Sequence, residues 1–358
     1  MVPVFETKRV HIENSNLSPT WIKDSGLTVD KLQRAICEIE KSGKAKQIVK
    51  ASTFKFIVEN AMIALDTDDI FQYKLNANGL MSEQRWRWEK EIRQRYLAED
   101  TATVLEAWDK LGAYQASSDF GHTSPNSRLM LSVGFPGLLD RVERAASRSG
   151  ISENQKDFYE SCRIVLLALM KAAARLSEAI RPYNEDNADA LLGISQKKPE
   201  NIYEAMQMLV LYFFMHEYIG GTRVRTLGRL DVLLEPFYKN DISSGRYTRD
   251  EIKEMLKFFL FKFWCAKVPF DLPFCLGGID ENGEEVTGEI SYLIVEAYNE
   301  LNIYSPKIHI RVSDKTPHDF VKLVLSCIRQ GNSSFVFVND NIGIEALKRV
   351  PIHHLINT

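Results

Sequence analysis

The segment from Leu272 to Arg311 constrains the fold most strongly, because the spacing of its apolar residues changes along its length. An apolar run ends at Gly277 and Gly278, and a turn rich in aspartate, asparagine and glycine follows. From Thr287 onwards apolar residues recur at helical spacing, and after Pro306 they alternate with polar residues as in a strand with one covered face. This order predicts a βαβ unit, which needs a larger parallel or mixed sheet to bury both of its faces.

Three segments in this part of the chain resemble the glycyl radical enzymes, the family of pyruvate formate-lyase and the radical glycerol- and choline-type lyases. The first is the glycine turn with its helix and the strand SPKIHIRV. The second is TLGRLDVLLEPFYKND at residues 226–241, and the third is FVFVND at residues 335–340. Each segment alone is only moderately specific for the family. The occurrence of all three in this order makes a chance resemblance improbable. A weaker similarity extends back to roughly residue 55.

The resemblance implies an α/β fold of a particular kind, a ten-stranded α/β barrel whose two five-stranded halves are enclosed by helices. We expect this chain to form the N-terminal half of such a barrel, largely helical, with strands around residues 272–278, 307–312 and 335–339. We expect an N-terminal arm over residues 1–50 and, over residues 51–358, the N-terminal part of a pyruvate formate-lyase-like domain, truncated before the cysteine loop. A half-barrel exposes a sheet edge and an apolar face, so we expect a homodimer or pairing with a C-terminal half.

The sequence lacks the two motifs that carry the family's chemistry. In the family, a glycyl radical near the C-terminus abstracts a hydrogen atom from a cysteine in a Gly-Cys-x-Glu loop, and the thiyl radical abstracts one from the substrate. None of the five cysteines of this chain has that context, and no Arg-Val-x-Gly-Tyr-like loop occurs. The resemblance implies that a separate iron–sulfur activating enzyme using S-adenosylmethionine installs the radical. No cofactor is expected to bind to this chain itself.

Composition excludes several other classes of function. The net charge is −3, and the 45 basic and 48 acidic residues are interspersed, which disfavours a nucleic-acid partner. The cysteines are odd in number, widely spaced and mostly set among apolar neighbours, which predicts reduced, buried thiols and disfavours disulfides or a zinc site. No signal-peptide core and no apolar window of membrane-spanning length is present, so we expect a soluble cytoplasmic protein.

A histidine in the loop DFGHTSP is the first candidate for contact with a substrate. A lone loop histidine is usually a hydrogen-bonded surface residue. However, the loop and the segment after it resemble the place where dehydratase-like members of the family present a histidine to the substrate hydroxyl. An imidazole suits that role, since it can donate to or accept from a hydroxyl near neutral pH. His122 is therefore a predicted substrate-binding residue.

Arg223 and Arg225 are the next candidates, because a guanidinium offers two parallel donors to a carboxylate or phosphate. The alternative is that they form ion pairs with acidic neighbours such as Asp231 or Glu217. Choline- and glycerol-type lyases carry Gly-His-Ser before their Gly-Arg pair, and Arg223 falls about where that histidine would lie. This departure suggests an anionic substrate. Asn339, at the polar end of a predicted buried strand, completes the substrate-binding candidates, and no catalytic or metal-binding residue is assigned.

The remaining periodic segments predict mainly helices. Thr28 is an expected N-cap, and Ser152 with Gln155 an expected capping box. Residues 184–199 are predicted to be a polar loop with a short apolar insert. Helices are expected over residues 28–42, 53–65, 82–97, 127–146 with a break at Pro136–Gly137, 152–183, 201–218, 247–266, 317–330 and from 341 onwards.

Three functions are compatible with these observations. The chain is a fragment of a glycyl radical lyase, dehydratase or formate acetyltransferase of anaerobic metabolism that acts on a small metabolite and is inactive alone. Alternatively, it is one subunit of a split radical enzyme, or a non-catalytic binding or scaffold protein built on the same fold. The radical-activating enzyme is an expected partner in the first two cases, whereas ligand binding without any partner would favour the third.

Overall fold

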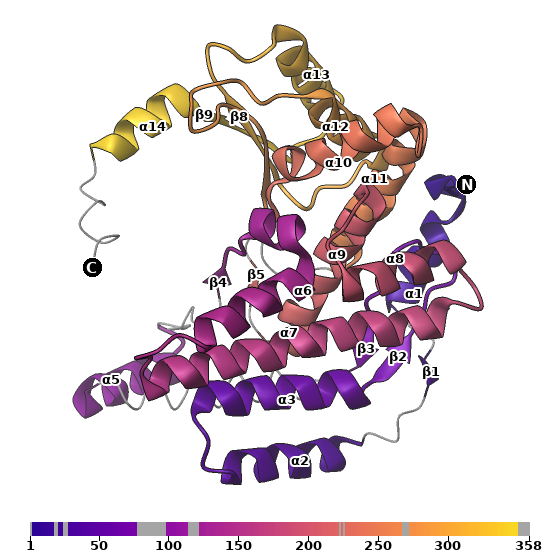
Figure 1. Ribbon diagram of the computed structural model, residues 1–358. Helices are drawn as coiled ribbons and strands as arrows, with labels where there is room; N and C mark the ends of the chain where they lie inside the picture. The colour runs from indigo at the N-terminus through magenta and orange to yellow at the C-terminus, as the bar shows by residue number, and fades with distance from the viewer. Residues whose placement is uncertain are drawn as a thin grey trace.

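The computed structural model describes residues 2–17, 21–23, 28–76, 98–113, 122–221, 223–224, 226–266 and 272–349. This part of the chain is mostly helical (Figure 1). The elements before the main sheet are η1 (Phe5–Thr7), α1 (Arg9–Leu17), β1 (Trp21–Lys23), α2 (Val29–Lys41), α3 (Lys46–Asn60), β2 (Met62–Ala64), β3 (Leu75–Asn76), α5 (Glu99–Lys110), β4 (His122–Thr123), α6 (Ser127–Ala146), α7 (Glu153–Ile180), α8 (Glu185–Gln196), α9 (Ile202–Phe214), the π-helical η2 (Met215–Ile219) and β5 (Arg223–Val224). Those that follow are β6 (Gly228–Arg229), α10 (Leu230–Ser244), α11 (Arg249–Cys265), β7 (Phe274–Gly277), α12 (Glu289–Leu301), β8 (Ile308–Val312), α13 (His318–Arg329), β9 (Phe335–Asn339) and α14 (Asp340–Lys348).

A parallel four-stranded sheet in the order β6-β7-β8-β9 organises the C-terminal part of the described chain. The predicted βαβ unit is confirmed: β7 and β8 are parallel neighbours, and α12 connects them. Their apolar side chains Phe274, Leu276, Ile308 and Ile310 are fully buried. Helix α10 packs against β6 and β7, and α12 and α13 continue the same helical layer (Figure 1).

Strand β9 differs from its prediction. FVFVND was expected to be a buried strand, and Phe335 is indeed buried, but Val336, Phe337 and Val338 are 43%, 38% and 38% exposed. The reason is position: β9 is the last strand of this sheet, and no described strand pairs with its outer edge. A two-stranded parallel pair, β4-β5, and a three-stranded antiparallel sheet, β1-β2-β3, complete the described strands. The half-barrel itself stays a prediction.

Helices α3, α6 and α7 form a second packed layer, in which α3 and α7 lie side by side (Figure 1). The predicted capping box is present, since the Ser152 side chain accepts the Gln155 N–H and Gln155 reaches back to the Ser152 N–H. The break in α6 is at Gly134, with φ 71°, and not at the predicted Pro136–Gly137. A proline is tolerated just after the break because it lies in the first turn of the new helical segment.

Two other helix predictions were wrong. Residues 184–199 were expected to form a loop, but α8 occupies most of them, with Asn184 as its N-cap and Ala188, Leu191 and Ile194 fully buried. The helix expected over 53–65 begins earlier and ends at Asn60, where the chain turns into β2. Local polarity concealed α8, because its short apolar stripe becomes informative only against α7. The predicted helix over 82–97 lies outside the described residues.

The core is continuous from the first described residues to the sheet. Phe5 is fully buried and makes edge-to-face contacts with Phe258 and Phe261 of α11. Its backbone N–H donates to Glu254 at 2.7 Å. The N-terminal segment is thus packed on the body, while the domain division at residue 50 stays a prediction.

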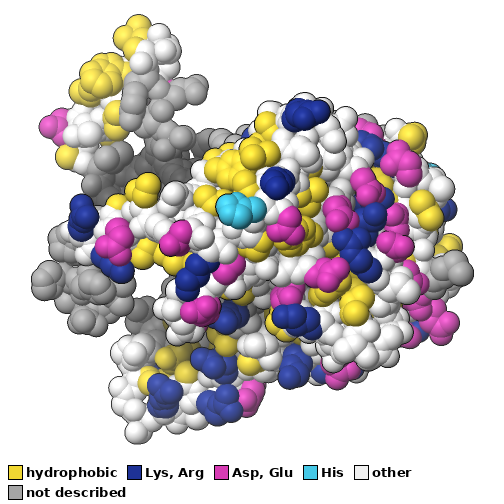
Figure 2. Space-filling model, turned by 90° about the horizontal axis from the view of Figure 1, so that it is seen from above, with side chains coloured by type: hydrophobic (Ala, Val, Ile, Leu, Met, Phe, Trp, Pro, Cys, Tyr) yellow, Lys and Arg dark blue, Asp and Glu magenta, His cyan; other side chains and the backbone are white. Residues whose placement is uncertain are grey.

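The cysteines are free thiols, but the expectation that they are buried was mostly wrong. Cys327 is buried, whereas Cys37 is exposed and Cys162, Cys265 and Cys275 are half-buried. On the visible face, basic and acidic side chains are mixed, with apolar side chains gathered between them (Figure 2). None of the helices in the described ranges has both the length and the apolarity needed to cross a membrane.

Candidate functional site

The carboxyl ends of the parallel strands bring together the densest polar network of the sheet. Its centre is the glycine turn, which we define as Gly277–Ile279, directly after β7. Gly277 and Gly278 both have positive φ, at 71° and 81°. A Cβ atom on Gly278 would lie 2.3 Å from Asp340 Oδ2 and 2.7 Å from Arg311 Cβ. Glycine is required here by both the backbone conformation and the lack of space.

Asp231, in the first turn of α10, anchors the start of the glycine turn. Its Oδ2 accepts the Gly277 N–H at 2.6 Å and the Ser291 hydroxyl at 2.8 Å. Burial raises the pKa of this carboxyl, while these hydrogen bonds act in the opposite direction. The carboxylate sits where strand β6 turns into α10, so helix α12, which carries Ser291, is tied to the same point.

Asp340 and Arg311 hold the other end of the turn. Arg311 Nε donates to Asp340 Oδ1 at 2.8 Å, and Asp340 Oδ2 accepts the Ile279 N–H at 2.9 Å. Arg229 completes the network by donating to the carbonyls of Gly277 at 2.8 Å and Ile279 at 3.0 Å. Burial, together with the nearby Arg311 guanidinium, lowers the pKa of Arg229. Because these donors and acceptors are already engaged, the glycine turn acts as a structural junction and not as a ready anion site.

Beside this junction, one row of side chains crosses the sheet on the face away from α10. The strand register pairs Arg229 with Cys275, Cys275 with His309, and His309 with Val336. We call this the open face, since these side chains are half-buried or exposed, while the residues before them on β7, β8 and β9, Phe274, Ile308 and Phe335, are buried. Arg229 Nε is buried and has no hydrogen-bond partner among the described residues. Burial raises the pKa of the Cys275 thiol, so it is protonated near neutral pH and unsuited to ionic nucleophilic attack.

Sequence reasoning did not select Arg229, Cys275, His309 or Arg311 as site residues. The available signal was alternation: in a strand with one buried face, every second residue faces the other side. Applied to IHIRV, it marks His309 and Arg311 as one set, opposite Ile308 and Ile310. The register that aligns His309 with Cys275 depends on strand pairing, which the alternation alone does not give.

Three of the four predicted site residues are described, and they lie in two places. His122 and Arg223 are partners in the parallel pair β4-β5, so their backbones are adjacent, although their side chains are outside the described set. Arg225 lies outside the described residues. Asn339 ends β9, is exposed, and uses its side-chain oxygen to accept the Ile342 N–H at 3.1 Å as the N-cap of α14. The substrate role of all four residues stays a prediction.

The π-helical turn η2 supports the β4-β5 pair. His216 Nε2 lies 3.3 Å from the Thr123 hydroxyl, and the Glu217 carboxylate accepts the Val224 N–H at 2.9 Å. Burial lowers the pKa of His216 to about 4, so its imidazole is neutral at physiological pH. The neutral ring and the carboxylate therefore fix the residues next to His122 and Arg223.

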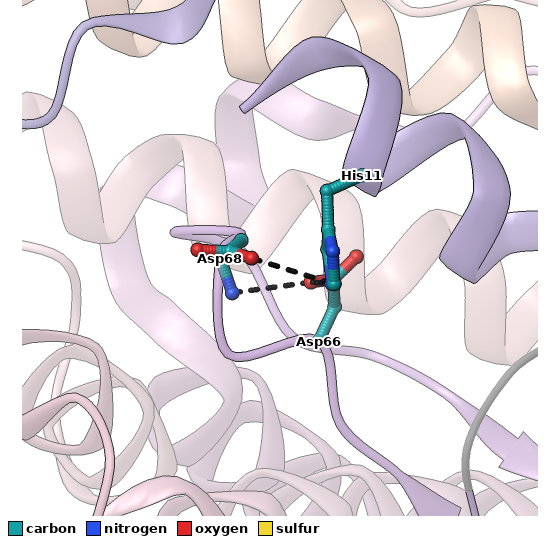
Figure 3. Close-up of side chains that lie close together, drawn as sticks. All are labelled: His11, Asp66 and Asp68. Carbon is teal, nitrogen blue, oxygen red and sulfur yellow. Dashed lines mark hydrogen bonds and ion pairs between the residues drawn. The ribbon is translucent and has the colours of Figure 1, made fainter. Parts of the chain in front are cut away.

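A separate group, His11 with Asp66 and Asp68, has the donor set of a cation site. Their ligand-type atoms lie within 4.8 Å of one another, and the side chains point toward each other (Figure 3). His11 Nε2 lies 3.3 Å from Asp68 Oδ2 and 3.7 Å from Asp66 Oδ1. However, Lys8 also contacts Asp68, and Asp66 accepts the Asp68 N–H. Lys8 already supplies a positive charge, so these contacts are accounted for as a network that ties α1 to the turn after β2.

Comparison with known proteins identifies the family. The pyruvate formate lyase-like family model matches residues 6–353. This chain belongs to the glycyl radical enzyme family. Trans-4-hydroxy-L-proline dehydratase of Clostridioides difficile is 29% identical over 226 residues, which are 54% of this chain and 28% of that protein. The glycyl radical subunit of 4-hydroxyphenylacetate decarboxylase from Clostridium scatologenes is 27% identical over 257 residues, 63% of this chain and 29% of that protein.

Solved glycyl radical enzymes share the fold. A structure described as 1,2-propanediol dehydration in Roseburia inulinivorans superposes with a TM-score of 0.73 at 17% sequence identity. The match covers 97% of this chain and 52% of that one. The chain therefore spans about half the length of this solved relative, and its residues follow the same fold over nearly their whole extent.

Proposed function

We propose that this chain is the N-terminal part of a glycyl radical lyase or dehydratase and that it supplies part of the wall around a small substrate. The main support for this proposal is the open face. There, a parallel sheet that helices cover on one side presents Arg229, Cys275 and His309 on the other side. Open α/β sheets usually bind ligands outside the carboxyl ends of their strands, and Arg229 lies at that end, where it donates to the carbonyls of the glycine turn.

The proposed substrate is a small metabolite with an anionic group. Both curated relatives described above act, by name, on molecules that carry a carboxyl group, trans-4-hydroxy-L-proline and 4-hydroxyphenylacetate. Arg223 and Arg225 are proposed to bind that group through paired guanidinium donors. His122, whose backbone lies beside that of Arg223, is proposed to form a hydrogen bond with a substrate hydroxyl. Asn339, the last residue of β9, is proposed as a further substrate-binding residue. A formate acetyltransferase reaction is the alternative within the family.

The residues present do not fit the radical chemistry itself. The family's chemistry needs a cysteine in a Gly-Cys-x-Glu loop and a glycine that stores the radical, and neither motif occurs in this sequence. Cys275 faces the open face but sits in the segment Pro-Phe-Cys-Leu-Gly, inside β7. We therefore propose that the chain is inactive alone. The missing loops would come from a C-terminal half, and the glycyl radical from a separate activating enzyme. The cytoplasmic location remains a prediction.

The first test is the native mass of the protein, purified without oxygen from its source, followed by electron paramagnetic resonance after incubation with an activating enzyme and S-adenosylmethionine. We expect a glycyl radical signal only when a chain with the cysteine and glycine loops is joined to or co-purifies with this one. A glycyl radical signal on the isolated 41.0 kDa chain would overturn the proposal.

The substrate role is tested by binding measurements on the assembled protein with 4-hydroxyphenylacetate and, as a neutral probe, glycerol. The double variant Arg223→Ala/Arg225→Ala is expected to weaken binding of the anion by at least about tenfold, because a charged hydrogen bond is lost. Arg144→Ala/Arg148→Ala, which removes two exposed charges in and just after the last turn of α6, is the matched control. Unchanged affinity of the first variant would contradict the anionic substrate. Binding of 4-hydroxyphenylacetate by the chain without any partner would favour the binding or scaffold protein instead.

A further inference from the structure

A large pocket lies in the helical layer, apart from the sheet and its glycine turn. It has a volume of about 590 Å³ and is bounded by α3, α6, α7 and the end of α9 with η2. None of the described residues that line it belongs to the four-stranded sheet. We call it the helical pocket. Its size is within the range of about 300–1,000 Å³ that is usual for small-molecule sites.

The described walls of the helical pocket are mostly apolar, and the charged residues among them are basic. Phe54 of α3, Leu138 of α6 and Leu166 and Leu169 of α7 form much of the lining. Lys50 and Arg141 are its charged residues, and no aspartate or glutamate is among the described residues that line it. Arg141 is exposed, and no described residue forms a hydrogen bond or an ion pair with it. This combination suits a molecule with an apolar body and one negative group.

One end of the pocket is polar but uncharged. Tyr212 and His216 stack there with their ring centroids 5.4 Å apart. The Tyr212 hydroxyl has no hydrogen-bond partner within the described ranges, although burial raises the pKa of this phenol and keeps it a donor. His216 is neutral, so the positively charged side chains among the described lining residues are Lys50 and Arg141.

We propose that the helical pocket binds an amphipathic carboxylate, with the chain of a medium-length fatty acid among its apolar residues and the carboxylate at Arg141 and Lys50. The apolar lining would stabilise the alkyl chain by removing it from water, which corresponds to about fourfold in affinity per buried methylene. The carboxylate would replace the water around the exposed Arg141 guanidinium. This site shares no residue with the open face, and it borders the proposed substrate residues only through His216, which contacts Thr123 beside His122.

The test is isothermal titration of the full 358-residue chain with octanoate, decanoate and decanol, below their critical aggregation concentrations. We expect decanoate to bind about sixteenfold more tightly than octanoate, because it buries two more methylenes, and about tenfold more tightly than decanol. Equal affinities for decanoate and decanol, or for decanoate and octanoate, would overturn the proposal.

Two variant pairs locate the site. Leu166→Trp should fill the pocket and reduce decanoate affinity at least about tenfold, whereas Leu167→Trp, on the adjacent residue that is 38% exposed and does not line the pocket, should leave it unchanged. Arg141→Gln should remove the preference for decanoate over decanol. Arg144→Gln is its control and should keep the preference, because the Arg144 guanidinium pairs with Asp140 at 2.8 Å. Because Arg141 is exposed, its replacement tests the proposal even where the tryptophan variant fails to fold. Wild-type behaviour of Arg141→Gln would overturn it.

Discussion

At the scale of single residues, two buried carboxylates determine how the sheet ends. Asp231 and Asp340 come from the beginnings of different helices and accept the first and last N–H groups of the glycine turn. Arg311 forms an ion pair with Asp340, and Arg229 donates to the carbonyls of Gly277 and Ile279. Because Asp340 and Arg311 pack closely against the turn, no room remains for a side chain at Gly278.

Replacing Gly278 with alanine is therefore expected to destabilise the fold by about 3 kcal/mol, because the positive φ is strained for alanine and the new Cβ collides with Asp340 and Arg311. Gly283→Ala is the matched control, since Gly283 also has a positive φ, 78°, but a methyl group added there would have no described atom within 4 Å. The control should cost about 1 kcal/mol. Chemical unfolding compares the two variants, and equal losses would show that the close contact at Gly278 is unimportant.

His216 gives a pH dependence whose sign follows from its burial. Its folded pKa, about 4, is below the ordinary value of 6.5, so the unfolded chain binds the proton more tightly. The contribution of His216 to the free energy of unfolding is fully present above pH 6.5. It should be lost as the pH falls toward 4, by up to about 3 kcal/mol. The difference between wild type and His216→Gln in urea unfolding at about pH 7, 5.5 and 4.5 measures this contribution. A difference that does not change with pH would contradict the burial of a neutral imidazole.

At the scale of elements, one arginine joins two neighbouring helices of the helical layer. Arg175 of α7 donates to the carbonyls of Val58 and Ala61, with 3.0 Å to Ala61, where α3 ends and its last carbonyls have no partner within the helix. The side chain thus caps α3 from a different helix. This arrangement explains why α3 stops at Asn60 although apolar residues continue beyond it.

We expect Arg175→Ala to lower the free energy of unfolding by about 2 kcal/mol, because charged hydrogen bonds to buried carbonyls are lost. Arg163→Ala, on the same helix, removes a surface pair with Glu160 at 2.8 Å and should cost less than about 1 kcal/mol. Urea denaturation followed by circular dichroism measures both. Should Arg175→Ala cost no more than Arg163→Ala, the cap would be dispensable.

At the scale of the whole molecule, the sheet ends in an exposed apolar strand. Val336 and Val338 of β9 are 43% and 38% exposed, and such an edge favours pairing with another chain or with a further part of the same one. This agrees with the proposed pairing, since the chain spans 52% of the Roseburia structure it resembles.

The isolated chain is accordingly expected to self-associate, and Val336→Lys/Val338→Lys to shift it to a 41.0 kDa monomer. Light scattering coupled to size-exclusion chromatography gives the masses. Leu325→Lys is the control, because Leu325 is 50% exposed but belongs to helix α13 and not to β9. A wild-type chain that is already monomeric, or a double variant that still associates, would show that β9 does not form the interface.

The sequence alone determined the features that depend on neighbours along the chain. Periodicity gave the βαβ unit, Thr28 and the Ser152–Gln155 pair were recognisable as caps, and three ordered segments were enough for the family. These succeed because helical and strand periods, and side chains that cap a helix, act over a few residues.

Only the tertiary structure decided which polar groups are engaged and which faces are covered. Asp231 meets Gly277 and Asp340 meets Ile279 across separations of 46 and 61 residues, and no local spacing encodes either contact. Helix α8 was missed because its apolar stripe gains meaning only against α7, and β9 was taken as buried because its composition does not reveal that it lies at the edge. Burial and long-range hydrogen bonds are properties of the packed chain, and they decide which residues remain available for a ligand.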